Sequence, residues 1–135
     1  MIDPDNVPPV DSKELLARYV FHRNYIRQDK TVKANAFIPH PYHALSVTRH
    51  RDATDEELWA VGADVAATQN KTLYGRGDIV ALTCLQQVLE VIAKPVSGNP
   101  NHADISAWPA DKPAQKIIAL ELAAKAVLRV APLSD

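Results

Sequence analysis

The stretch Ala44-Leu45-Ser46-Val47-Thr48-Arg49-His50, followed three residues later by Thr54-Asp55-Glu56-Glu57, places a strand signal directly before a helix signal. Apolar and polar side chains alternate in the first segment, which is typical of a half-buried strand. In the second segment, the Thr54 side chain can accept a hydrogen bond from a free amide of the first helical turn. The Glu57 side chain can accept one from the Thr54 amide, and the two bonds together make a capping box. The sequence therefore predicts a strand over 44–50 and a helix over 54–69.

The residues before this strand and helix predict a second group of elements. Asp11 and Glu14 resemble a helix start, and the aromatic and β-branched residues after them favour strands. Before them, residues 1–10 hold three prolines without a periodic pattern, so we expect a flexible or extended arm. The expected elements are a short helix over 12–18 and an antiparallel hairpin of strands 19–26 and 31–38 around a turn at 27–30.

The C-terminal side alternates apolar segments with polar loops. Asp111 and Pro113 predict the start of a long helix, and Pro132 predicts its end. The expected elements are a loop over 70–78, a strand or short helix over 79–85, a strand over 89–96, a loop over 97–109 and a helix over 112–130. Hairpin-like links come early and helices come late, which favours an α+β fold over alternating βαβ units.

The chain is thus expected to form one α+β domain over 11–131. We expect a mostly antiparallel small sheet packed by two longer helices (54–69 and 112–130), with a short N-terminal helix added. Two residues inside these elements need an explanation. Gly62 costs a helix about 1 kcal/mol relative to alanine, which a close crossing by another element would explain. Cys84 is the only cysteine, so it forms no intrachain disulfide and is interpreted as a small buried hydrophobe.

Composition excludes several classes of function. The formal net charge of −1, from 15 basic and 16 acidic residues, argues against general nucleic-acid binding but not against a local basic patch. No apolar run approaches the ~18 residues of a membrane span. The N-terminus has neither the basic nor the apolar region of a secretory signal, so a cytoplasmic location is expected.

Three polar loops, at 39–43, 70–78 and 97–109, carry the side chains most suited to chemistry. Loops of this kind commonly hold functional groups on a rigid scaffold, so we expect the three to converge on one site. The candidate residues are His40, His43, Lys71, Tyr74, Arg76, Asn99, Asn101, His102 and Asp104, with Lys33, Asn35, Arg49 and His50 extending the site from neighbouring strands.

Three kinds of chemistry are open to these residues. Arg49, Lys71 and Arg76 have the charges of an anion site, although no phosphate-loop motif is present. His102, with either His40 or His43, could act as acid and base. Histidines with Asp104 could also hold a metal, but their spacing matches no known metal motif, so no metal or cofactor is assigned. Tyr74, Asn99, Asn101 and Asp104 would orient the ligand.

The sequence therefore predicts a basic, His-containing loop site for a phosphate-bearing ligand such as a nucleotide or an RNA end. Whether the protein is a phosphoester- or nucleotide-processing enzyme stays open. The alternative is a non-enzymatic interaction module, a homo-oligomer or accessory subunit of a bacterial-type system. Its interface would be the apolar C-terminal helix and the Pro-rich N-terminal arm.

Overall fold

A six-stranded antiparallel sheet, in the strand order β4-β5-β2-β1-β3-β6, organises the protein. This computed structural model describes residues 7–39 and 43–132. The strands are β1 (Leu15–Val20), β2 (Leu45–Arg49), β3 (Gly75–Val80), β4 (Glu90–Ala93), β5 (His102–Ser106) and β6 (Val127–Val130). The helices are α1 (Asp55–Thr68), α2 (Ala81–Gln86) and α3 (Lys112–Lys125), with 3-10 turns at Arg23–Tyr25 and Ala34–Phe37. The predicted α+β fold is confirmed.

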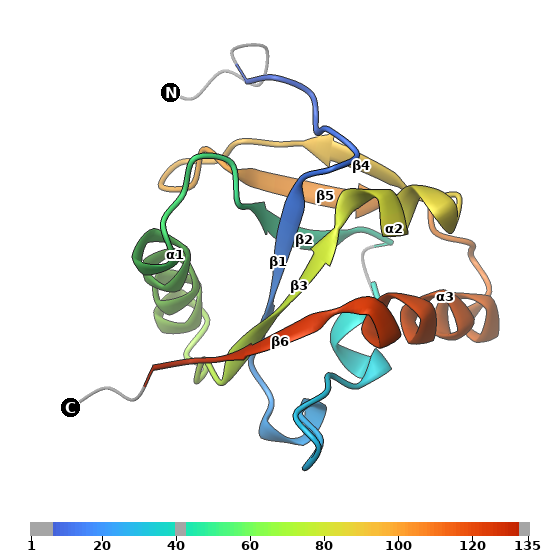
Figure 1. Cartoon of the computed structure of the whole chain (residues 1–135), viewed down its shortest axis with the longest axis horizontal. Helices are drawn as coiled ribbons and strands as arrows, with labels where there is room; N and C mark the ends of the chain where they lie inside the picture. Colours follow the sequence, from blue (N-terminus) through green and yellow to red (C-terminus); the bar gives the residue numbers. More distant parts are fainter. Residues whose placement is uncertain (1–6, 40–42, 133–135) are drawn as a thin grey trace.

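The two faces of the sheet are covered by different elements. Figure 1 shows α1 on one side of β1 and β3, and α2 and α3 on the other. Leu16, Val20 and Ile79 bury their side chains on the α2–α3 side, in one apolar cluster with Phe37 and Leu122. No helix in the described residues is long and apolar enough to cross a membrane.

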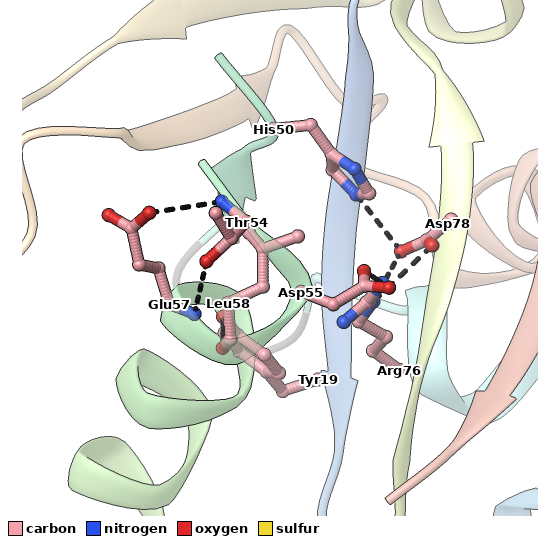
Figure 2. A network of polar contacts seen from close by, with 8 residues as sticks. All are labelled: Tyr19, His50, Thr54, Asp55, Glu57, Leu58, Arg76 and Asp78. Atoms are coloured by element: carbon pink, nitrogen blue, oxygen red, sulfur yellow. Dashed lines mark hydrogen bonds and ion pairs between the residues drawn. The ribbon is translucent and has the colours of Figure 1, made fainter. Parts of the chain in front are cut away.

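Helix α1 crosses β1 closely, and Gly62 makes this approach possible. A Cβ atom at Gly62 would lie 2.7 Å from Cε1 of Tyr19, so only glycine fits beneath the ring. The Tyr19 hydroxyl also donates a hydrogen bond to the carbonyl of Leu58. The predicted capping box is confirmed, because Thr54 and Glu57 exchange hydrogen bonds of 3.1 Å in both directions (Figure 2).

The predicted short helix over 12–18 is wrong, because most of this segment belongs to β1. The local signal at Asp11 and Glu14 does form hydrogen bonds: the Glu14 amide donates to the Asp11 carbonyl, and the Asp11 amide donates to the Glu14 carboxylate. It makes a single turn that leads into the strand. The ladders to β2 and β3 use the backbone groups that a helix would need.

The predicted hairpin of 19–26 and 31–38 is also wrong. Beyond Val20 the chain forms 3-10 turns, and only an isolated bridge between Ile26 and Val32 remains of the expected ladder. Val32 and Phe37 are fully buried in the core cluster on the α2–α3 side of the sheet. Burial of these side chains therefore determines the path of the segment more than its β propensity does.

Strands replace parts of three other predicted elements. The predicted loop 70–78 contains the first four residues of β3, the predicted loop 97–109 contains β5, and the predicted helix 112–130 ends at Lys125 before β6. Gly75 signals a loop in sequence, yet in β3 a Cβ there would lie 2.6 Å from the Arg129 carbonyl of β6. Strand β6 pairs with the edge of β3 that would otherwise be open, so its backbone groups join the sheet. Helix periodicity in the sequence does not reveal this pairing.

The backbone conformation of Val88 can be tested by substitution. It follows α2 with φ of 63°, a left-handed conformation that favours glycine, and its side chain is 84% exposed. We expect Val88→Gly to raise the free energy of unfolding by about 1 kcal/mol, because it relieves strain in a β-branched residue. Asn70 occupies the same position after α1 with φ of 55°, and asparagine tolerates it. Urea denaturation should therefore show a smaller change for Asn70→Gly; a loss of stability in Val88→Gly would contradict the assignment.

Candidate functional site

A cleft opens where the ladder between β1 and β2 stops. The two strands pair only at Leu16–Arg49 and Ala17–Thr48. If the same register continued, Arg18 would pair with Val47 and Tyr19 would pair with Ser46. Instead, these four residues line a cleft of about 290 Å³ on the α1 side of the sheet.

The walls of the cleft come from four parts of the chain. Val65 and Gln69 of α1 and Lys71 just after it form one wall, and Asn99 and His102 form another. Phe21 and Thr48 complete the lining. The described residues contribute three basic side chains to this lining and no carboxylate. The cleft is therefore suited to a ligand that carries negative charge.

Arg18 is the half-buried cation of the cleft. Its Nε donates to the Ala36 carbonyl at 2.7 Å, and its Nη1 donates to the Ser46 carbonyl at 2.9 Å, so it bridges the gap between β1 and β2. Among the described residues, neither a carboxylate nor an acceptor for Nη2 is recorded beside it. Burial lowers the pKa of Arg18 to about 10, which leaves it charged at neutral pH. The result is a half-buried guanidinium whose hydrogen-bond partners, among the described residues, are backbone carbonyls rather than a carboxylate.

His102 is held in one orientation by the carbonyl of Lys94, 2.9 Å from its Nδ1. Because a carbonyl only accepts, Nδ1 donates in this contact, and Nε2 is the ring nitrogen left without a hydrogen bond among the described residues. Nε2 lies 3.8 Å from Oδ1 of Asp104, which in turn pairs with Lys94 at 3.3 Å. Asp104 is not part of the cleft lining.

Asn99 fixes the turn that carries His102. Its Nδ2 donates to the Thr48 hydroxyl at 3.0 Å, and its Oδ1 accepts from the Asn101 amide at 3.1 Å. Asn101 in turn donates from Nδ2 to the Arg51 carbonyl at 2.9 Å. These bonds tie the turn to the end of β2. Of the predicted orienting residues, Asn99 lines the cleft and Asn101 anchors the turn behind it.

A second polar cluster lies beside the cleft, centred on Arg76 (Figure 2). Arg76 donates from Nη2 to Asp55 at 2.7 Å and from Nε to Asp78 at 3.1 Å, and its guanidinium lies 4.5 Å from the centre of the Trp59 ring. His50 contacts Asp78 at 3.2 Å. Burial disfavours the charge of Arg76, but the two carboxylates outweigh it and raise its pKa. This cluster joins the start of α1 to β3.

Arg49 is likewise matched by a carboxylate. It is 1% exposed, and its Nε and Nη2 donate to Glu14 at 2.7 and 2.8 Å. Its Nη1 donates to the Pro8 carbonyl at 2.9 Å, so part of the N-terminal segment is tied to the sheet. Arg49 and Arg76 were predicted to bind an anion, but both are already neutralised within the protein.

The structure brings together some of the predicted site residues and separates others. Lys71, Asn99 and His102 meet in the cleft. Tyr74 and Asp104 lie outside its lining, as does the exposed His43, while His40 lies outside the described residues. Arg18, Thr48 and Phe21 also line the cleft but were not among the predicted site residues. No local motif marks them, because what they share is the place where two strands diverge.

Comparisons with known proteins do not extend this assignment. No family model, curated protein or solved structure matches the chain. Among the described residues, no group of three or more His, Cys, Asp and Glu side chains is arranged to hold a metal ion. The function is therefore argued from the geometry and charge of the cleft.

The Arg49–Glu14 pair predicts a pH-dependent stability. Burial raises the pKa of Glu14, but hydrogen bonds from Arg49 and the Asp11 amide lower it further, to below its ordinary value of 4.5. The pair's contribution is thus present above about pH 4.5 and is lost as the pH falls through the folded-state pKa. We expect Glu14→Gln to cost about 3 kcal/mol at pH 7, because it leaves Arg49 buried without a counter-charge.

Urea denaturation across pH checks this expectation. The difference in free energy of unfolding between wild type and Glu14→Gln should shrink as the pH is lowered below about 4.5. Glu121→Gln, at an exposed position of α3, is the matched control and should change stability little. A difference that stays constant with pH would show that Glu14 does not act through its charge.

Proposed function

We propose that the protein binds a phosphate-bearing ligand in the cleft between β1, β2 and α1. The observation that supports this most directly is Arg18, a half-buried guanidinium that donates to two backbone carbonyls. A phosphate oxygen would supply the missing negative charge and would accept a short, charge-assisted hydrogen bond from Arg18. The recorded partners of Arg49 and Arg76 include carboxylates, so those two arginines do not offer this opportunity.

The remaining lining residues complete the proposed anion site. Lys71 follows α1 and is exposed, so its ammonium can move onto a ligand; at present it lies 5.7 Å from the centre of the Phe21 ring. The hydroxyl of Ser46 can also donate to a phosphate. His102 offers Nε2 as a group that can accept or deliver a proton. Ligand binding is the core of the proposal, and proton transfer by His102 would add phosphoester chemistry to it.

Thermal unfolding with phosphate tests the proposal. Titration of inorganic phosphate against chloride at constant ionic strength should raise the Tm of the wild type, because a ligand that binds only the folded state stabilises it. Arg18→Met should abolish the increase, and Lys71→Met should reduce it.

The exposed Lys71 keeps this test interpretable if Arg18→Met folds poorly. Lys13→Met, at an exposed position outside the cleft, should respond to phosphate as the wild type does. An equal response of Lys71→Met and Lys13→Met, or no response of the wild type, would overturn the proposed site.

A second candidate function is supported by exposed apolar side chains on α2 and α3. Ile117 and Leu120 of α3 are 64% and 46% exposed, and Leu82 and Leu85 of the neighbouring α2 are 45% and 44% exposed. Such clusters commonly mark protein interfaces. We propose this helical face as the interface if the protein is a homo-oligomer. The N-terminal arm is a weaker element of that alternative, because Pro8 is held by Arg49.

Light scattering coupled to size-exclusion chromatography tests this alternative. The wild type should elute as an oligomer, and the double variant Ile117→Lys/Leu120→Lys should elute as a folded monomer, because the added charges cannot be buried at an interface. Ala63→Lys, on an exposed position of α1, should leave the mass of the oligomer unchanged. A monomeric wild type would exclude the interface.

A further inference from the structure

The cleft continues into a second hollow along α1. This hollow also measures about 290 Å³ and shares Val65, Gln69, Asn99 and His102 with the cleft. Ligand sites for small molecules commonly have volumes of about 300 to 1,000 Å³, so each hollow alone is at the lower limit. Together they form one groove of ordinary size, which is suited to a ligand longer than phosphate.

The second hollow has a different chemistry from the cleft. Val61 and Val65 of α1 form one apolar wall, and Val96 lies opposite. The opposite wall is a tight turn, because Val96 and Asn99 exchange two backbone hydrogen bonds of 3.1 and 3.0 Å. Two apolar walls, one of them braced in this way, form a slot that can enclose a flat, largely apolar group.

Charge changes sign along the groove. Arg18 and Lys71 line only the cleft, His102 lines both hollows, and Asp64 lines the second hollow but not the cleft. A third hollow of about 270 Å³ adjoins the second and is lined by both Asp64 and Glu57. A nucleic-acid strand that followed the groove would bring further phosphates against these carboxylates. The groove therefore favours a ligand with one phosphate end and an uncharged body that donates hydrogen bonds.

We propose that the ligand is a mononucleotide, with its phosphate in the cleft and its base in the second hollow between α1 and the Val96–Asn99 turn. A base has the required flat apolar faces, and its amino and imino groups can donate to Asp64. This inference rests on the proposed function, because the phosphate must occupy the cleft. It adds the class of ligand and the direction in which the ligand lies.

Isothermal titration with inorganic phosphate, ribose 5-phosphate, the four nucleoside monophosphates and a short single-stranded RNA tests the inference. At least one mononucleotide should bind about ten-fold tighter than ribose 5-phosphate, because the base buries apolar surface in the second hollow. Thr68→Trp places an indole in that hollow and should weaken mononucleotide binding about ten-fold while phosphate binding stays within about two-fold of the wild type. Ala67→Trp, at the neighbouring exposed position outside the hollow, is the matched control and should affect neither.

The outcomes separate the two proposals. If phosphate binds but no mononucleotide exceeds ribose 5-phosphate, or if Thr68→Trp and Ala67→Trp behave alike, the base is not in the second hollow and the inference is overturned while the cleft stands. RNA that binds more tightly than every mononucleotide would instead identify a polymer and also overturn it. If neither phosphate nor any mononucleotide binds, the anion site itself is wrong, and the inference fails with it.

Discussion

The early end of the ladder between β1 and β2 is the constraint from which the cleft follows. In a continuous antiparallel sheet, Tyr19 and Ser46 would satisfy each other's backbone groups, and no hollow would form there. Arg18 instead reaches from β1 across the gap to the Ser46 carbonyl of β2 and also donates to the Ala36 carbonyl of the 3-10 turn. The same side chain therefore links the two strands where their ladder stops and contributes positive charge to the cleft. Structure and candidate function depend on one guanidinium.

The environments of two buried arginines and one half-buried arginine show why only Arg18 suits a ligand. Removing a guanidinium from water is costly unless a negative charge compensates for it. Arg49 and Arg76 receive that compensation from Glu14, Asp55 and Asp78, and both link elements of the fold. Burial shifts the pKa of Arg18 downward instead, because its recorded partners are neutral carbonyls. An arrangement of this kind costs stability in the free protein, and an anion would recover part of that cost on binding.

Local signals in the sequence correctly predicted elements that are held by hydrogen bonds between residues close in the chain. They failed where strands pair with segments far away in the chain. The capping box at Thr54 and the alternation of β2 needed no information from elsewhere. The turn at Asp11 formed as well, but the ladders of β1 prevented it from continuing as a helix. The segment that forms β3 was predicted to be a loop because it contains glycines. In the structure these glycines do not form a turn but allow other segments to approach closely. The same limit applies to the site: loop residues such as His102 could be proposed, whereas Arg18 could not.

The direction of the groove follows from how the turn after β4 is anchored. Asn99 bonds to Thr48 at the last registered pair between β1 and β2, so the turn lies beside the point where the strands diverge. Helix α1 is fixed opposite the turn by Tyr19 and by the Arg76 cluster at its start. Neither wall depends on a ligand for its position, since each is bonded to the sheet. A preformed groove of this kind loses little conformational entropy on binding, so the contacts of a small ligand can appear largely as affinity.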